Sequence, residues 1–205
     1  MSGHDEDDGR SAGSAHAPDA EGTDLRLRRP LPDDHPRVVA VIDEWWGGRR
    51  MSALLPRLWF EHFSGTSWIA EDAHGRLLGF LVAFVSADDP DTAYIHMVGA
   101  DPNRRRLGIG RTLYERSFED LVARGARRVT CITWPGNRIS IAFHRSLGFH
   151  IDDGPGTTPI YGTPAHPDHD GPGDDRVVFI RDLDGRRPAG DVDGRRPAGD
   201  PGAAR

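Results

Sequence analysis

Residues 98–114 combine glycine and arginine residues in an arrangement that suits the binding of an anion. Gly108 and Gly110 stand where helical periodicity begins, so unpaired backbone amides and the positive end of a helix dipole would face outward. Glycine at these positions lets a phosphate group approach the backbone without obstruction by a side chain. Guanidinium groups pair with phosphate oxygens in a forked geometry, and the segment supplies Arg104, Arg105, Arg106 and Arg111. The pattern therefore predicts a site for a phosphate or diphosphate.

A glycine-containing turn beside solvated arginines is the competing interpretation of this pattern. Two other kinds of phosphate site are excluded. The chain contains no lysine, so a Walker-type nucleotide site cannot form. The strand expected before Gly108 is not the first strand of a β-α-β unit, as a Rossmann site requires.

The elements that must position this segment follow from the periodicity of the apolar residues. The expected strands lie at residues 24–29, 66–71, 77–86, 92–100, 127–133, 148–151 and 176–182. The expected helices run from about Asp34 to Gly47, from Leu54 to Phe63, from Gly108 to near Gly125, and from Asn137 to Leu147. Residues 152–175 are so rich in Gly, Pro, Asp and His that no regular structure is expected there, and we interpret them as a substrate-side flap.

Two motifs resemble those of the GNAT superfamily of coenzyme A-dependent N-acyltransferases. Residues 102–110, Pro-Asn-Arg-Arg-Arg-Leu-Gly-Ile-Gly, resemble its motif R/Q-x-x-G-x-G/A, and residues 137–149 resemble its motif N-x-x-(A/S)-x-x-(F/L)-(Y/H)-x-x-x-G-F. Together with the order of the elements, the resemblance covers residues 24–182. It implies an α+β fold with about four helices around a mixed, mostly antiparallel seven-stranded sheet. That sheet would splay between its fourth and fifth strands to admit acyl-CoA.

The resemblance also implies how acetyl-CoA, the expected co-substrate, is held. Backbone amides of residues 106–111 would bind the pyrophosphate, and Val98 and Ala100 would pair with the pantetheine arm as an added strand does. Asn137 would orient the arm; capping the next helix is its competing role, and the two roles can coexist. The expected co-substrate residues are Val98, Ala100, Arg105, Arg106, Leu107, Gly108, Ile109, Gly110, Arg111 and Asn137.

Acetyl transfer to an amine requires a neutral amine and a proton for the departing thiolate. Members of the family often supply this proton from a tyrosine, and the matching position here is His144. Packing in the helix with a hydrogen bond to a backbone carbonyl is the competing role for His144. Strand alternation places Tyr94, His96 and Val98 on one face, with Tyr94 and His96 near the place where related enzymes keep a glutamate or a bound water. His96 is the expected base, and a structural histidine on a half-buried strand is the alternative.

Several other residues carry weaker signals. Trp45, Trp46, Trp59 and Phe60 would belong to a helix pair that forms one wall of the acceptor cleft in similar proteins, with core packing expected for at least two of the tryptophans. Cys131 lies in mid-strand with no evident base, which disfavours a covalent intermediate on it. His166 and His169 lack a second cluster at ligand spacing, so no metal site is expected.

Composition limits the class of protein. The net charge of −6 is concentrated in residues 1–23, while residues 183–205 repeat the sequence DGRRPAGD, and both ends are expected to be disordered tails around one domain at 24–182. The nearly neutral remainder lacks the basic face of a nucleic-acid-binding protein. No apolar stretch has the length of a membrane helix, and no signal peptide is evident, so cytoplasm is the expected location.

The predicted function is transfer of an acetyl group from acetyl-CoA to a primary amine by direct attack in a ternary complex. The expected partner is a small-molecule amine, with neither nucleic acid nor membrane, and homodimerisation stays open. Two alternatives remain at this point. One is a catalytically weak acyl-CoA-binding or regulatory module, favoured by the absence of the usual tyrosine at position 144. The other is acetylation of a protein, at its N-terminus or at a lysine.

Overall fold

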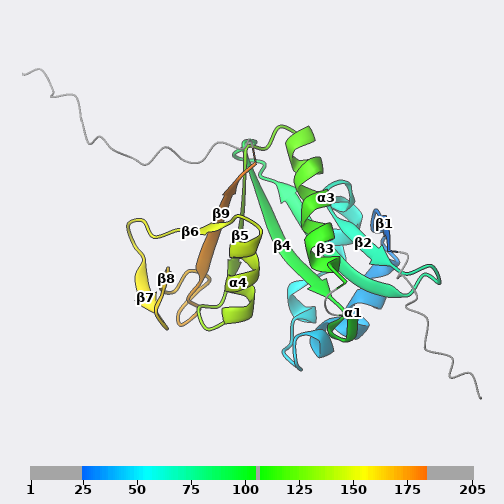
Figure 1. The fold of residues 1–205 in the computed structure, drawn as a ribbon, viewed down its shortest axis with the longest axis horizontal. Helices are drawn as coiled ribbons and strands as arrows, with labels where there is room; N and C mark the ends of the chain where they lie inside the picture. The colour runs from blue at the N-terminus through cyan, green and yellow to red at the C-terminus, as the bar shows by residue number, and fades with distance from the viewer. Residues whose placement is uncertain (1–24, 105–106, 184–205) are drawn as a thin grey trace, which may run out of the picture.

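A computed structural model of the chain describes residues 25–104 and 107–183 (Figure 1). Its main feature is a seven-stranded sheet in the order β1-β2-β3-β4-β5-β9-β6. All neighbouring strands are antiparallel except β4 and β5, which are parallel. The strands of this sheet are β1 (Arg26–Arg28), β2 (Trp68–Glu71), β3 (Leu77–Val85), β4 (Thr92–Ala100), β5 (Arg128–Thr133), β6 (His150–Ile151) and β9 (Val177–Asp182). The predicted α+β fold with a mixed seven-stranded sheet is confirmed.

Helices cover both faces of the sheet and enclose two apolar clusters. The helices are α1 (Asp34–Trp45), α2 (Leu58–His62), α3 (Ile109–Ala123) and α4 (Arg138–Ser146), and the 3₁₀ turns are η1 (Ser52–Leu54), η2 (Ser64–Thr66) and η3 (Pro102–Arg104). On one face, Leu113 of α3 and Ile141 of α4 are buried in the larger cluster. On the other face, Ile42 of α1 and Phe60 of α2 are buried in the smaller cluster. Burial of these apolar helix faces is what fixes the helices on the sheet.

The sheet parts between β4 and β5, as predicted. These two strands pair only through the first three residues of β4, ending with Tyr94 opposite Thr130. From Ile95 to Ala100, the only strand that pairs with β4 in the described part of the chain is β3. Figure 1 shows the strands diverging below this point, with α3 and α4 on the near side of the opening.

The second predicted helix is shorter than expected. The sequence pattern predicts a helix over residues 54–63, whereas the chain forms the single turn η1 and then α2, which begins at Leu58. The cause is Pro56: proline disfavours the helical conformation for the preceding residue, and Leu55 is indeed outside it, at φ −125° and ψ 67°.

The expectation of no regular structure in residues 152–175 was wrong. The segment contains an antiparallel hairpin of β7 (Thr158–Ile160) and β8 (Thr163–Ala165). Tyr161 and Gly162 connect the strands, with φ of 51° and 79°, and positive φ at both central residues is typical of a type I′ turn. The composition of the whole segment concealed a short pattern, Thr-Pro-Ile-Tyr-Gly-Thr-Pro-Ala, that is compatible with such a hairpin.

The predicted tails lie outside the described residues apart from Leu183, so their disorder stays a prediction. None of the described helices is long and apolar enough to cross a lipid bilayer.

Candidate active site

The turn before α3 is open at the position where the sequence predicts a phosphate group. Gly108 has φ 72°, a left-handed conformation that favours glycine, and a β-carbon placed there would meet nothing within 4 Å. The first hydrogen bond of α3 runs from the Thr112 amide to the Gly108 carbonyl. The amides of Ile109, Gly110 and Arg111 donate to no other described residue. The turn therefore presents a row of amides without a described partner at a helix N-terminus.

The side chains around this turn are less available than its backbone. Arg105 and Arg106 lie outside the described residues. Arg111 donates to the carbonyl and hydroxyl of Ser146 in α4, both at 3.3 Å, so part of its guanidinium is already occupied. A β-carbon on Gly110 would lie 3.2 Å from the ring of Phe143, which explains why a glycine suits the close contact of α3 with α4. Leu107 is exposed, and Ile109 is buried in the core.

The free edge of β4 carries Val98 and Ala100. Val98 pairs with Leu81 and Ala100 pairs with Gly79, both on β3. The edge that faces β5 has no partner strand beyond Tyr94 in the described chain, so an extended ligand could pair with it.

A bulge in β4 corrects the predicted alternation of its side chains. Val82 pairs with Met97 but Ala83 pairs with Ile95, which leaves His96 as the extra residue. A bulge of one residue reverses the faces that follow it. Val98 therefore packs with the cluster under α3, whereas Met97 belongs to the cluster under α1 and α2. The prediction that Val98 shares a face with His96 was wrong.

His96 lies in the bulge beneath α2, with one ring nitrogen bonded and the other open. Its Nε2 lies 2.7 Å from the carbonyl oxygen of Leu54. A carbonyl can only accept, so Nε2 carries the proton in the neutral ring and Nδ1 is left with a lone pair. Nδ1 has no partner among the described residues. The indole of Trp59 stacks on the imidazole at 4.3 Å with an angle of 11° between the rings.

Tyr94 lies at the point where the sheet parts. Burial raises the pKa of its phenol to about 12, with a smaller contribution from the Asp170 carboxylate and an opposing one from Arg176. The phenol is therefore neutral at physiological pH. Because these two charges belong to the segment after β8, that segment lies within electrostatic reach of Tyr94. Asp170 and Arg176 also pair with each other at 2.7 Å.

His144 is buried, and both of its ring nitrogens are bonded. Nδ1 lies 2.8 Å from the Ser140 carbonyl, and Nε2 lies 2.7 Å from the Tyr114 hydroxyl. The Nδ1 proton therefore goes to the carbonyl, and Nε2 accepts the hydroxyl proton of Tyr114. The ring stacks on Phe179 at 4.4 Å. Burial lowers the pKa of His144, against the opposing effect of the Ser140 hydrogen bond, so its neutral form is favoured.

Asn137 caps α4 in this structure. Its side-chain oxygen accepts from the Ser140 amide at 3.2 Å, and its side-chain nitrogen donates to the Thr133 hydroxyl at 3.2 Å. Both interactions fix the start of α4 beside the end of β5.

The tryptophans of the first two helices have two roles, packing in the core and contact with His96. Trp45 and Trp46 pack against Phe80 in the core, with ring centroids 6.4 and 6.3 Å apart. Trp59 instead covers His96.

Sequence reasoning missed Tyr114, because its position in α3 fits an apolar core residue. Nothing in the sequence indicates that its hydroxyl contacts a histidine 30 residues later.

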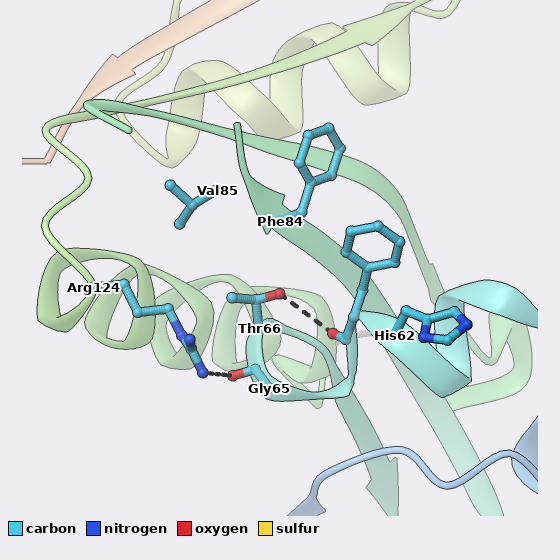
Figure 2. Close-up of a pocket in the computed structure, with 7 residues that line it drawn as sticks. His62, Gly65, Thr66, Phe84, Val85 and Arg124 are labelled. Atoms are coloured by element: carbon cyan, nitrogen blue, oxygen red, sulfur yellow. Dashed lines mark hydrogen bonds between the residues drawn. The ribbon is translucent and has the colours of Figure 1, made fainter. Parts of the chain in front are cut away.

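A hollow of about 350 Å³, which we call the Arg124 pocket, lies where β3 ends and α3 ends (Figure 2). It is lined by His62, Phe63, Gly65, Thr66, Phe84, Val85 and Arg124. The Arg124 guanidinium donates to the Gly65 carbonyl at 3.0 Å on one side of the pocket. Sequence analysis singled out none of these residues as a site, although Phe63 ends the second predicted helix.

Within the described part of the chain, no group of three His, Cys, Asp or Glu side chains could hold a metal ion. His166 instead lies 2.8 Å from a carboxylate oxygen of Asp152.

Comparison with known proteins gives a consistent result. The sequence model of the acetyltransferase (GNAT) family matches residues 29–149. An L-2,4-diaminobutyric acid acetyltransferase of Nocardia farcinica is 26% identical over 156 residues, covering 76% of this chain and 80% of that protein. A mycothiol acetyltransferase of Thermomonospora curvata is 30% identical over 152 residues, covering 61% of this chain and only 50% of that protein.

Solved structures show the same fold. The diaminobutyrate acetyltransferase of Paenibacillus lautus, in complex with L-2,4-diaminobutyric acid and coenzyme A, superposes with a TM-score of 0.55 at 23% identity, covering 78% of this chain and 96% of that one. A phosphinothricin acetyltransferase of Sinorhizobium meliloti, in complex with acetyl-CoA, gives 0.58 at 21% identity, covering 78% and 88%.

Proposed function

Because this chain belongs to the acetyltransferase (GNAT) family, we propose that it transfers an acetyl group from acetyl-CoA to a primary amine of a small molecule. Family membership confirms the predicted enzyme class, with acetyl-CoA as co-substrate and an amine as acceptor. The choice of a small molecule as acceptor and the assignment of individual residues are proposals. The observation that carries them is the open turn at Gly108, placed at the mouth of a sheet that parts between β4 and β5.

The donor would lie along the opening of the sheet. The pyrophosphate would accept hydrogen bonds from the amides of residues 107–111, with Arg105 and Arg106 as further candidates from the sequence. The pantetheine arm would pair with the free edge of β4 at Val98 and Ala100, which places the thioester toward Tyr94. Asn137 would orient this arm indirectly. Its capping hydrogen bonds hold the start of α4, which would lie beside the arm.

His96 is the proposed base. The amine nitrogen attacks the thioester carbonyl carbon, a C–N bond forms as the C–S bond breaks, and the amine loses a proton to Nδ1 of His96, directly or through water. The Leu54 carbonyl holds the ring in the tautomer that leaves Nδ1 free. Trp59 would stabilise the resulting imidazolium, because a cation stacked on an indole is attracted to its ring face.

One observation favours direct attack in a ternary complex. The Cys131 thiol is buried, and burial raises its pKa, so the thiolate needed for a covalent intermediate is strongly disfavoured. The departing coenzyme A thiolate takes up one proton. His144 is a poor donor for this proton, because its neutral ring has already placed its only N–H on the Ser140 carbonyl. The proton received by His96 would instead return to the thiolate through water.

The acceptor would approach from the side of α2, where His96 and Tyr94 lie. The curated relatives include L-2,4-diaminobutyric acid acetyltransferases, whose named acceptor is a small amine. That name and the aromatic surroundings of His96 support a small-molecule acceptor.

The test is release of coenzyme A thiol from acetyl-CoA in the presence of a panel of small amines, with the acetylated product identified by mass spectrometry. Gly108→Glu should abolish turnover and acetyl-CoA binding, because it places a carboxylate and a strained backbone where the pyrophosphate would lie. Gly125→Glu is the matched control, since Gly125 also has positive φ and open space but lies beyond the opposite end of α3. Unchanged acetyl-CoA affinity in Gly108→Glu would refute the proposed donor site.

A further inference from the structure

We infer that the Arg124 pocket binds the part of the acceptor that lies away from its amine, and that this part is an apolar or aromatic group ending in a carboxylate. The inference rests on the proposed function, because it assumes that an amine is acetylated beside His96. Three features of the described residues support it: an unpaired cation, apolar walls that continue to His96, and a position next to the parting of the sheet.

Arg124 is a cation without a described anionic partner. The only hydrogen bond of its guanidinium within the described chain goes to the Gly65 carbonyl. By contrast, the Arg28 and Arg29 guanidinium groups form bidentate pairs with Asp34 and Asp120. A guanidinium has five N–H donors in a planar fork that matches a carboxylate. Arg124 therefore has donors left at the rim of the pocket for an anionic group of a ligand.

The apolar walls of the pocket continue to the proposed base. Phe63 and Phe84 line the pocket, and their ring centroids are 5.7 Å apart. Trp59 lies against both, at 4.8 Å from Phe63 and 5.9 Å from Phe84, and its other neighbour is the His96 ring. These partly exposed rings, each in contact with the next, form an aromatic path over the surface from the His96 ring to the pocket. A flat or apolar spacer would bury its surface along this path.

The pocket also begins where the sheet parts. Phe84 and Val85 pair with Tyr94 and Ala93 on β4, and Tyr94 is the last residue of β4 that pairs with β5. A thioester carried toward Tyr94 would thus approach the path from the end opposite to Arg124. A volume of about 350 Å³ is in the lower part of the range for small-molecule sites and holds a group the size of a benzoate.

The experiment compares three amines that differ only at the far end: 3-(aminomethyl)benzoate, its methyl ester, and benzylamine. The wild-type enzyme should prefer the carboxylate. Arg124→Gln should lower kcat/KM for 3-(aminomethyl)benzoate by about tenfold or more, a loss of about 1.4 kcal/mol, and should leave the ester and benzylamine nearly unchanged. Arg124→Lys should restore part of the preference because it restores the charge. Arg145→Gln is the control, since Arg145 is exposed on α4.

Other results would overturn the inference. No preference of the wild type for the carboxylate, or an equal loss with all three amines in Arg124→Gln, would remove the pocket from acceptor binding. If none of the three amines is acetylated, binding of sodium benzoate is measured by NMR titration. A saturable shift that Arg124→Gln abolishes would support the pocket even though these amines fail as substrates, whereas no shift would refute it. Turnover and pocket binding can therefore fail separately.

Discussion

Two histidines, His96 and His144, lie in regions of the molecule that differ in burial and in the hydrogen bonds they offer to the imidazole ring. His96 is half-buried in a strand bulge, with Nε2 on the Leu54 carbonyl and Nδ1 without a described partner. His144 is only 6% exposed, and both of its nitrogens are bonded. A histidine can take up a proton at the reaction centre only where the fold leaves one of its ring nitrogens without a partner. By this criterion we propose His96 as the base and a structural role for His144.

The largest expected effect is on turnover when the open nitrogen is removed. His96→Ala should lower kcat by about 10²- to 10⁴-fold, the usual contribution of a general base, with the affinity for acetyl-CoA little changed. Steady-state kinetics and acetyl-CoA titration measure the two quantities. A variant with nearly full turnover would show that His96 only fills the bulge.

The second effect concerns stability. His144→Leu should lower the free energy of unfolding by about 1–3 kcal/mol, because it leaves the buried Tyr114 hydroxyl without its acceptor. Turnover per folded molecule should stay within about tenfold of wild type, well short of a full general-acid contribution. Chemical denaturation and active-site-normalised kinetics test this.

The reverse pattern would restore the predicted acid role of His144. In that case the variant would keep its stability and lose turnover as severely as His96→Ala. Tyr114→Phe is the matched control, since it removes the same hydrogen bond from the other side and leaves the imidazole in place.

Much of the fold, but less of the site, could be predicted from the sequence. The fold followed from local patterns: apolar alternation in residues 92–100, helical spacing after Gly108, and the two motifs, all of which occupy short stretches of chain. The parted sheet followed from the resemblance. These predictions succeed because neighbouring residues share one element and one periodicity.

The properties of the site depend on contacts between distant residues. The bulge that turns Val98 away from His96 arises from pairing with β3, and the alternation rule cannot foresee it. The partner of His144 is a hydroxyl on another helix, and the partner of His96 is a carbonyl in η1. The Arg124 pocket gathers residues from η2, β3 and the end of α3. Residue spacing in a single sequence does not predict such contacts between distant segments.

The pH dependence of stability gives a third, smaller test. Burial lowers the pKa of His144 in the folded protein below its ordinary value of 6.5. The unfolded chain therefore binds this proton at a higher pH than the folded protein does. The resulting stability is present above about pH 6.5 and is lost as the pH falls through that value toward the lower folded pKa. Comparison of melting temperatures of wild type and His144→Leu from pH 8 to pH 5 isolates this effect, and parallel curves would contradict it.

The smallest effect expected concerns Trp59, whose indole stacks on the imidazole of the proposed base His96. If its indole stabilises the imidazolium of His96, Trp59→Leu should lower kcat by about fivefold, corresponding to about 1 kcal/mol for a partly exposed cation–π contact. Trp59→Phe should retain most of the rate, because a phenyl ring keeps the ring face. Trp45→Leu is the control: Trp45 packs on Phe80 in the core, so its loss should lower the melting temperature and spare kcat. Equal kcat losses in Trp59→Leu and Trp45→Leu would mean that both act only through packing, and His96 would then depend on the Leu54 carbonyl alone.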